Sequence, residues 1–291
     1  MRASLFRPAG TVLSTALFTA VALFGTSAPA SATDTAGPRY YLALGDSLAA
    51  GYQTLPGGGH VTGRGYAQDI ARTLAARASA GGGSFGFVGL GCPGETTGSM
   101  IDGGCPYPHS YADSQLAEAE TFLRTHHDAR TVVTLDIGAN DVDRCMTAGN
   151  IDVACTVAGI GKVRSGLDTI LDRLKAAAGP RTRIVGMNLY DPYLAAWMTG
   201  SQGRSAAALS VPLGDALNAT IGLTDALHGI PTADVAAAFR TNSFLPLTPL
   251  GGQQVPLNVA RILQWTNMAR GDIHANDTGY QVIADTFLKK F

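Results

Sequence analysis

The sequence predicts an α/β fold, a parallel sheet with helices on both faces. Two observations predict it. Short apolar stretches of strand length alternate along the chain with longer stretches whose apolar residues recur at helical spacing. Glycine-rich or proline-containing turns separate many of these stretches. Such alternation is typical of parallel sheets, because a crossover helix returns the chain to the same edge of the sheet after each strand.

Five strands are expected from apolar and β-branched content. The most strand-like stretch is Thr-Val-Val-Thr-Leu, which begins at Thr131. The expected strands cover residues 40–44, 85–90, 131–137, 183–187 and 232–235.

Helices are expected between the strands. Tyr66, Ile70 and Leu74 lie four residues apart and predict a helix that ends at three glycines, 81–83. A second helix is expected around 116–123, with Asp113 or Ser114 as its cap. The other expected helices are a long one through 157–174, one over 206–227 that Pro212 and Gly214 interrupt, and a final one over 278–291.

The first 32 residues have the features of an export signal. Two arginines precede an apolar run at 12–24, and the small residues that follow end in an A-x-A pattern at 30–32. The run is short for a membrane span. We therefore expect a secreted mature chain of residues 33–291, with cleavage after Ala30 as the alternative.

The mature chain has the size of one α/β domain. Removing 32 of 291 residues leaves 259, enough for a single substantial core, and we expect one domain and a monomer. The charge is nearly balanced, with 21 Lys and Arg against 22 Asp and Glu. No basic run alternates with aromatic residues, so nucleic-acid binding is not expected. We also expect no stable membrane insertion, because no other stretch combines enough length with enough apolar content.

Four cysteines fit an exported protein, in which disulfides persist. They are Cys92, Cys105, Cys145 and Cys155, and three pairings are open to them. We favour Cys92 with Cys105 and Cys145 with Cys155, because each bridge closes a short loop and would contribute about 3 kcal/mol. A zinc site is the alternative, but there is no C-x-x-C pair or nearby histidine cluster. We expect no metal and no cofactor.

The first strand runs directly into Gly45-Asp46-Ser47. Ser47 thus stands at the carboxyl end of a strand, the edge of an open α/β sheet where ligands bind. A serine is a weak nucleophile unless a base and oxyanion donors lie beside it. Alone, the tripeptide is better explained as an ordinary turn after a strand. We expect Asp46 to anchor this turn through backbone hydrogen bonds.

Three later segments supply the missing groups at strand ends. After the second strand, the run GLGCPGETTGSM contains Gly94, whose N–H can approach a ligand because no side chain is in the way. After the third strand, DIGAND brings the side-chain amide of Asn140 to the same edge. Before the last helix, RGDIHAND places His274 on a loop.

These four blocks, in this order, resemble the SGNH/GDSL family of serine esterases and lipases. The resemblance extends from Tyr40 to the last helix, and CPGETT and GDIH are most similar to the secreted actinobacterial branch, which includes esterases, lipases and phospholipases. It implies a flavodoxin-like three-layer α/β/α sandwich and an enzyme that hydrolyses carboxylic esters.

The resemblance also implies roles that the chemistry requires. Ser47 would attack the ester carbonyl, and His274 would take its proton and pass it to the departing alcohol. The N–H groups of Ser47 and Gly94 and the amide of Asn140 would hold the oxyanion, at about 3 kcal/mol for each donor. The alternatives are a helix-capping His274, an Asn140 that only fills a turn, and a Gly94 that only permits a bend. We prefer the catalytic roles because all four blocks occur together.

The histidine block departs from the family in one respect. The family commonly has an aspartate three residues before its histidine, a place that Gly271 takes here, and Asp272 is only two residues before His274. Either the Asp272 carboxylate orients His274, or a backbone carbonyl at 271 or 272 does so in a Ser-His dyad. We slightly favour the carbonyl, because the shorter spacing should aim the carboxylate differently.

The sequence does not specify the ester. Phe244–Leu250, with Ile262, Leu263 and Trp265, either lines an acyl groove or packs the core beneath the histidine loop. We expect a lipase or esterase acting on a small-molecule or lipid ester. A carbohydrate O-deacetylase with the same site is the alternative, and a non-catalytic secreted binding protein is the alternative of a different class.

Overall fold

The structure is a computed structural model that describes residues 39–55, 58–147 and 150–291. The chain divides into two units, Met1–Thr35 and Ala36–Phe291, and all described residues belong to the second. The expected export signal, residues 1–32, lies outside the described residues.

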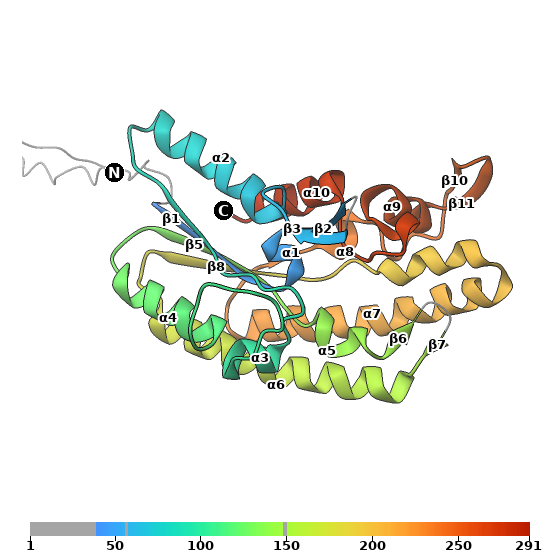
Figure 1. Ribbon diagram of the computed structural model, residues 1–291, viewed down its shortest axis with the longest axis horizontal. Helices are drawn as coiled ribbons and strands as arrows, with labels where there is room; N and C mark the ends of the chain where they lie inside the picture. The colour runs from blue at the N-terminus through green and yellow to red at the C-terminus, as the bar shows by residue number, and fades with distance from the viewer. Residues whose placement is uncertain (1–38, 56–57, 148–149) are drawn as a thin grey trace, which may run out of the picture. The chain divides into compact units, whose positions relative to one another are not determined.

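A five-stranded parallel sheet forms the centre of this unit, in the order β4-β1-β5-β8-β9 (Figure 1). This confirms the predicted α/β fold, and each of the five expected strands is present with shifted ends. The strands are β1 (Tyr40–Gly45), β4 (Gly86–Gly89), β5 (Thr131–Asp136), β8 (Thr182–Met187) and β9 (Thr232–Ala233).

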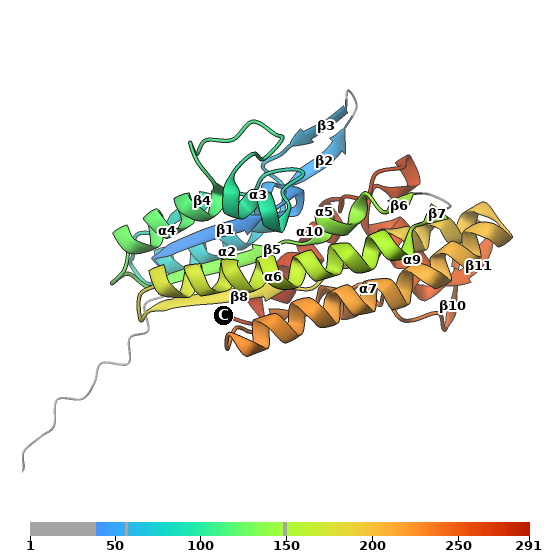
Figure 2. The same cartoon turned by 90° about the horizontal axis from the view of Figure 1, so that it is seen from below.

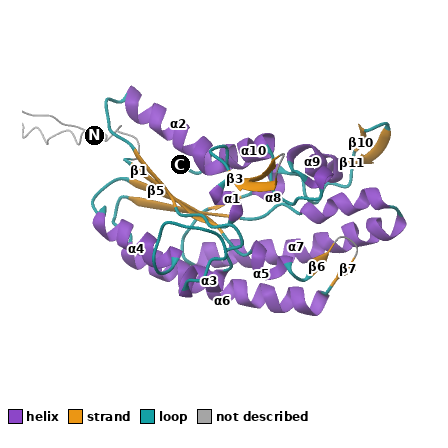
Figure 3. Ribbon diagram, viewed as in Figure 1, coloured by secondary structure: helices purple, strands orange, loops and turns teal. Residues whose placement is uncertain are grey.

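Helices cover both faces of the sheet and complete a three-layer sandwich (Figures 1 and 3). One face carries α2 (Tyr66–Ala80) and α10 (Asp277–Leu288), which pack against each other. The opposite face carries α4 (Gln115–Thr125), α6 (Val153–Ala177) and α7 (Ser201–Leu227). Figure 2 shows α6 and α7 lying side by side along most of their length.

The sheet is buried on both faces, as a parallel sheet between two helix layers requires. Every residue of β5 is buried, and so are Tyr41 to Leu44 of β1. The helical positions Tyr66, Ile70 and Leu74 are also fully buried on α2. The apolar periodicity of the sequence therefore corresponds to the observed core.

Shorter elements lie in the connections between these layers. The short helices are α1 (Ser47–Ala50), α3 (Thr97–Asp102), α5 (Ala139–Asp143), α8 (Val235–Ala238) and α9 (Leu257–Trp265). Two 3-10 helices are η1 (Pro192–Thr199) and η2 (Met268–Arg270). Three antiparallel pairs are β2 (Tyr52–Leu55) with β3 (Gly58–Val61), β6 (Met146–Thr147) with β7 (Asn150–Ile151), and β10 (Leu247–Leu250) with β11 (Gln253–Pro256).

The expected interruption of the helix over 206–227 is wrong. Helix α7 is continuous from Ser201 to Leu227, with Pro212 inside it and exposed. Its buried residues keep helical spacing before and after the proline: Ala207, Ser210, Leu213, Leu217 and Ile221. Packing of this face against α6 and η1 outweighs the cost of about 3 kcal/mol that a proline imposes inside a helix.

Among the described helices, only α7 is long and apolar enough by composition to cross a membrane. In the structure, its apolar face packs on α6, η1 and β8 instead. The same composition is typical of a helix that covers a sheet.

Candidate active site

Ser47 is the first residue of α1, which follows strand β1. The turn requires glycine at position 45, where φ is +141° and a Cβ would collide with Asp136. Asp46 caps the helix, and its Oδ1 accepts a hydrogen bond of 2.9 Å from the N–H of Leu48. The anchoring role expected for Asp46 is confirmed, and the turn presents Ser47 at the carboxyl edge of the sheet.

His274 reaches Ser47 from the loop between η2 and α10. Its Nε2 lies 2.8 Å from Ser47 Oγ, a hydrogen bond in which the hydroxyl donates to a neutral imidazole. Two contacts fix the loop. The N–H of Asn267 donates to the carbonyl of His274 at 2.8 Å, and the hydroxyl of Tyr190 donates to the carbonyl of Ile273, also at 2.8 Å.

The carboxylate of Asp272, not a backbone carbonyl, contacts the other ring nitrogen. His274 Nδ1 lies 2.5 Å from Asp272 Oδ1, which differs from our slight preference for a carbonyl. The same Oδ1 accepts the backbone N–H of His274 at 3.2 Å. The two-residue spacing therefore produces a turn in which the side chain curls back over its own backbone, preceded by Gly271 at φ +76°.

The electrostatics of Asp272 agree with this contact. Burial by itself would raise the pKa of Asp272, but the hydrogen bonds that its carboxylate accepts from His274 and Thr54 lower it below the ordinary value. A carboxylate with a lowered pKa remains negative at neutral pH. It can therefore hold the imidazole in the tautomer that leaves Nε2 free to accept the Ser47 proton.

Tyr52 packs against the imidazole of His274. The ring centroids of Tyr52 and His274 lie 4.6 Å apart with the planes inclined by 50°. The carbonyl of Tyr52 in turn accepts a hydrogen bond of 2.6 Å from Tyr280 on α10. This aromatic contact limits rotation of the histidine ring, and it joins segments that are more than 200 residues apart in sequence.

Asn140 lies on α5, immediately after β5. Gly138 precedes the helix at φ +113°, a conformation that suits glycine. The side-chain amide of Asn140 donates to the carbonyl of Glu95 at 2.9 Å and lies 3.4 Å from Asp46 Oδ2. Asn140 also lines the same cavity as Ser47 and His274. The structure therefore brings three of the expected site residues together around one opening.

Gly94 is connected to the site by its neighbour Glu95. The carbonyl of Glu95 accepts a hydrogen bond from the side-chain amide of Asn140. Gly94 has φ +84°, and a Cβ there would lie 2.8 Å from Pro106, so only glycine fits. It is not among the residues that line the cavity. Within the described chain, no hydrogen bond uses the N–H of Ser47 or Gly94.

Two buried acids lie beneath the nucleophile. Burial raises the pKa of Asp46 to about 6, against the opposing effect of its hydrogen bond from Leu48. Burial, together with the charge of Asp46, holds the pKa of Asp136 well above its usual range. Asp136 Oδ1 accepts a hydrogen bond of 2.6 Å from Tyr66. The raised pKa of Asp136 favours its protonated form, which lowers the repulsion between the two acids.

A largely apolar cavity of about 90 Å³ opens beside Ser47 and His274. It lies between α5, η1 and α7. Its lining residues away from the reacting groups include Leu48, Ala139, Val142, Met146, Leu189, Tyr190, Pro192, Tyr193, Gly214, Leu217 and Ile273. Buried Asp191 also lines it and accepts a hydrogen bond of 2.6 Å from Ser210, while burial raises the pKa of Asp191 to about 6.

The residues proposed from sequence for an acyl groove lie elsewhere. None of Phe244–Leu250, Ile262, Leu263 or Trp265 lines this cavity. Ile262 is fully buried, and Trp265 packs edge-on against Phe239. The alternative interpretation, core packing, therefore applies to these two residues. Leu245 and Leu247 are exposed at the start of the β10–β11 hairpin.

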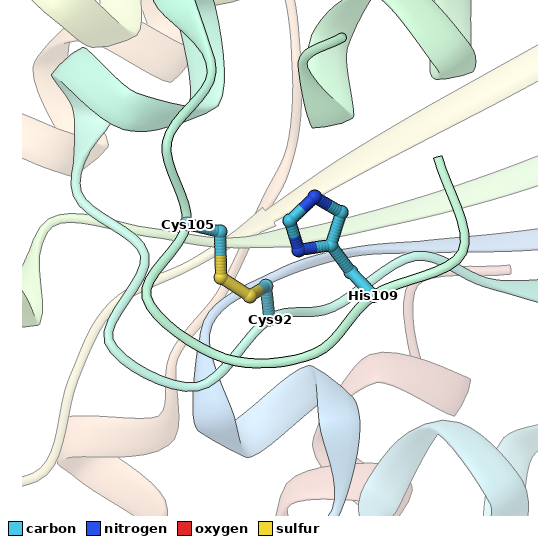
Figure 4. A group of neighbouring side chains, drawn as sticks. All are labelled: Cys92, Cys105 and His109. Atoms are coloured by element: carbon cyan, nitrogen blue, oxygen red, sulfur yellow. A yellow bond between two sulfur atoms is a disulfide. The ribbon is translucent and has the colours of Figure 1, made fainter. Parts of the chain in front are cut away.

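The four cysteines form the favoured disulfides, Cys92–Cys105 and Cys145–Cys155. The first brackets the segment that contains Gly94, and the second lies next to the cavity residue Met146. His109 lies beside the Cys92–Cys105 bridge (Figure 4). Within the described ranges this is the only group of three residues with metal-ligating spacing. Because the two sulfurs are joined in a disulfide, the group lacks the thiolates that a zinc site needs.

Comparison with known proteins identifies the family. Residues 43–282 match the GDSL-like lipase/acylhydrolase family. The chain belongs to this family. The match includes every residue of the Ser47, Asp272 and His274 arrangement, and it makes the chain an ester hydrolase by family. A search of curated proteins found no match.

Solved structures of other hydrolases share the fold of this GDSL-family chain. A phospholipase A1 from Streptomyces albidoflavus is 21% identical, covers 87% of this chain and 100% of its own, and has a TM-score of 0.52. An extracellular lipase from Streptomyces rimosus is 19% identical, with coverage of 87% and 99% and a TM-score of 0.54. An acetylxylan esterase from Geobacillus stearothermophilus is 16% identical, with coverage of 88% and 95% and a TM-score of 0.51. The three-layer fold is therefore that of the family.

Three residues near the site have no signal in the sequence. Tyr52 and Tyr190 resemble ordinary core aromatics, and Glu95 resembles a solvated loop acid, although it is fully buried. Their contacts with the catalytic segments depend on long-range packing. Only the position of Glu95, next to Gly94, could have drawn attention to it.

Proposed function

We propose that the mature chain is a secreted serine hydrolase that cleaves carboxylic esters through an acyl-enzyme on Ser47. The observation that carries this proposal is the chain of hydrogen bonds from Ser47 Oγ to His274 Nε2 (2.8 Å) and from His274 Nδ1 to Asp272 Oδ1 (2.5 Å). Nucleophile, base and orienting acid within hydrogen-bond reach are what nucleophilic catalysis requires.

In the first half-reaction, Ser47 Oγ attacks the ester carbonyl carbon while its proton moves to His274 Nε2. The carbonyl oxygen becomes an oxyanion, which the N–H groups of Ser47 and Gly94 and the Asn140 amide hold. When the tetrahedral intermediate collapses, the bond to the alcohol oxygen breaks, and His274 gives its proton to that oxygen. The alcohol leaves, and the acyl group remains bound to Ser47.

In the second half-reaction, water replaces the alcohol. His274 removes a proton from the water as its oxygen attacks the acyl carbon, and the same donors hold the second oxyanion. The proton then returns to Ser47 Oγ, which releases the carboxylic acid. In both halves, the Asp272 carboxylate stabilises the imidazolium that forms on His274.

The cavity between α5, η1 and α7 is the proposed site of the acyl chain. Its wall contains Leu48, Val142, Met146 and Leu217, and burial of a chain methylene contributes about 0.8 kcal/mol. An apolar cavity favours a lipase or esterase over an enzyme for acetylated sugars, because an acetyl group offers little apolar surface. The export signal expected from the sequence and the two disulfides support the proposed secreted location.

A serine-directed fluorophosphonate and a series of p-nitrophenyl esters test the proposal together. The protein is expected to form a covalent adduct at Ser47 and to hydrolyse butyrate to octanoate esters faster than acetate. Acetylated polysaccharides serve as the comparison substrate. Preference for the polysaccharide would favour the O-deacetylase, whereas ligand binding without labelling or turnover would identify a non-catalytic binding protein.

Gly214 is expected to set the length of acyl chain that the enzyme accepts. It lines the cavity on α7, and a Cβ built there meets no atom within 4 Å. Gly214→Leu should therefore fill the cavity and lower kcat/KM for octanoate about tenfold or more relative to acetate. Helix propensity favours the substitution, so the melting temperature should not fall.

Gly222→Leu is the matched control for this prediction. Gly222 lies on the same helix, has equally open space around it and does not line the cavity. Its substitution should leave the chain-length profile unchanged. An unchanged profile in Gly214→Leu as well would show that the acyl chain does not occupy this cavity.

A further inference from the structure

The side chain of Glu95 is fully buried next to the oxyanion residue Gly94. Its carboxylate accepts three hydrogen bonds. Ser99 Oγ donates to Oε1 at 2.5 Å, while Tyr111 Oη and Gln115 Nε2 donate to Oε2 at 3.1 Å and 2.8 Å. A carboxylate taken from water is costly unless its oxygens are well satisfied, and here both oxygens have donors.

Gln115 connects these hydrogen bonds to the turn that contains Gly45 and Ser47. Its Oε1 accepts the N–H of Gly45 at 2.6 Å, and its Nε2 donates to the carbonyl of Gly45 at 2.9 Å. Gln115 therefore holds both backbone groups of the residue two positions before Ser47. The same Nε2 contacts Glu95, so that the two buried side chains form one unit.

The backbone of Glu95 holds the third oxyanion donor. Its carbonyl accepts the Asn140 side-chain amide at 2.9 Å, which orients that amide. A second tie joins the same two segments, because Asp141 accepts hydrogen bonds from the N–H of Thr97 at 2.9 Å and from its hydroxyl at 2.8 Å. Glu95 is thus adjacent to Gly94, in contact with Asn140, and joined through Gln115 to the Ser47 turn.

The three expected oxyanion donors come from three different segments: the end of β1, the loop after β4, and the start of α5 after β5. No single secondary-structure element fixes their separation. An error of about 1 Å in the position of a catalytic group can cost a factor of a hundred in rate. The relative positions of the three segments must therefore be fixed by contacts between them. The hydrogen bonds of Glu95 and Gln115 reach all three segments.

We propose that Glu95 is a positioning residue that sets the geometry of the oxyanion hole, with Gln115 as its link to the nucleophile turn. The proposal rests on the proposed serine-hydrolase function. Glu95 acts on the stability of the transition state, because aligned donors matter most when negative charge develops on the carbonyl oxygen.

Glu95→Gln tests the proposal with nearly unchanged shape. The amide is neutral and has only one acceptor oxygen in place of two, so all three donors lose a charged partner and at least one of them loses its acceptor. We expect kcat to fall about tenfold while KM stays within about twofold, as for a contact that acts in the transition state. The inhibition constant of an alkylboronic acid, which forms a tetrahedral adduct on Ser47, should rise by the same factor as kcat falls.

Glu120→Gln is the matched control. Glu120 is a second buried glutamate, on α4 with Gln115, and it accepts hydrogen bonds from Arg173 at 2.6 Å and Arg124 at 3.1 Å, away from the site. Its substitution should lower the melting temperature and leave kcat and boronate inhibition unchanged. A Glu95→Gln protein that behaves in this way would overturn the proposal, as would a loss that appears only in KM.

Tyr111→Phe keeps the test decisive if Glu95→Gln does not fold. It removes one donor to Glu95 and retains the ring, so kcat and boronate affinity should fall together by a smaller factor. Unchanged values for this folded variant would overturn the proposal. Failure of the underlying function has a different signature, because the wild-type protein itself would then resist the boronate and the fluorophosphonate.

Discussion

Ser47→Ala is expected to abolish ester hydrolysis while leaving the fold intact. Ser47 and His274 act as one unit, and loss of either member of such a unit lowers kcat by several orders of magnitude, up to about a millionfold. Ser47 is a small side chain at the start of a short helix that Asp46 caps, so its hydroxyl contributes little to stability. Initial rates with p-nitrophenyl esters and a circular-dichroism melting curve measure the two effects.

Two further variants complete this test. His274→Ala should cost about as much as Ser47→Ala, because His274 Nε2 takes the Ser47 proton in the proposed mechanism. Ser201→Ala is the control, since Ser201 is also the first residue of a helix but is exposed and far along the chain from the site. Turnover retained by pure Ser47→Ala protein would sink the serine-hydrolase proposal.

Local sequence patterns were sufficient to predict the layers of the fold. Strands β1 and β5 are buried on both faces, so each appears in the sequence as a short apolar run rather than as an alternation. Helix α2 could likewise be predicted from local sequence, because its apolar residues recur at helical spacing and a glycine follows its last residue. Pro212 misled the prediction because a local rule was applied where tertiary packing along α7 decides the outcome.

The groups that position the catalytic residues could not be predicted in this way. Glu95, Gln115 and Gly45 make contacts across 20 to 70 residues of sequence, and such contacts leave no periodic signal. Tyr52 and His274 come from opposite halves of the sequence and meet only in the folded chain. The blocks containing Ser47 and His274, by contrast, stand in short motifs at element boundaries, where glycine and polar residues are visible in the sequence.

The cavity proposed for the acyl chain could not be predicted from the sequence either. Its wall combines residues of α5, which follows β5, with residues of η1 and α7, which both follow β8. Apolar content alone suggested Phe244–Leu250, which in the structure enters a hairpin with exposed leucines. Composition identifies apolar surface, but only the arrangement of the elements decides which apolar surface borders the nucleophile.

Asp272→Asn is expected to lower kcat about a thousandfold or more, as in triads whose aspartate orients the histidine. The spacing in sequence had favoured a modest loss, but the 2.5 Å contact between Asp272 Oδ1 and His274 Nδ1 changes the expectation. An amide keeps the shape and removes the negative charge that stabilises the imidazolium. If its NH₂ group turns toward Nδ1, the histidine is also forced into the tautomer that cannot accept the Ser47 proton.

The outcome distinguishes a triad from a dyad. Asp277→Asn is the control, because Asp277 is a nearby aspartate at the start of α10 that binds Gln53 and Arg64 and does not touch His274. It should retain activity. For Asp272→Asn, circular dichroism must show a folded protein and KM should change little, since the carboxylate acts on the transition state. A loss smaller than about tenfold would mean that a backbone carbonyl orients His274 and that the Asp272 carboxylate is dispensable.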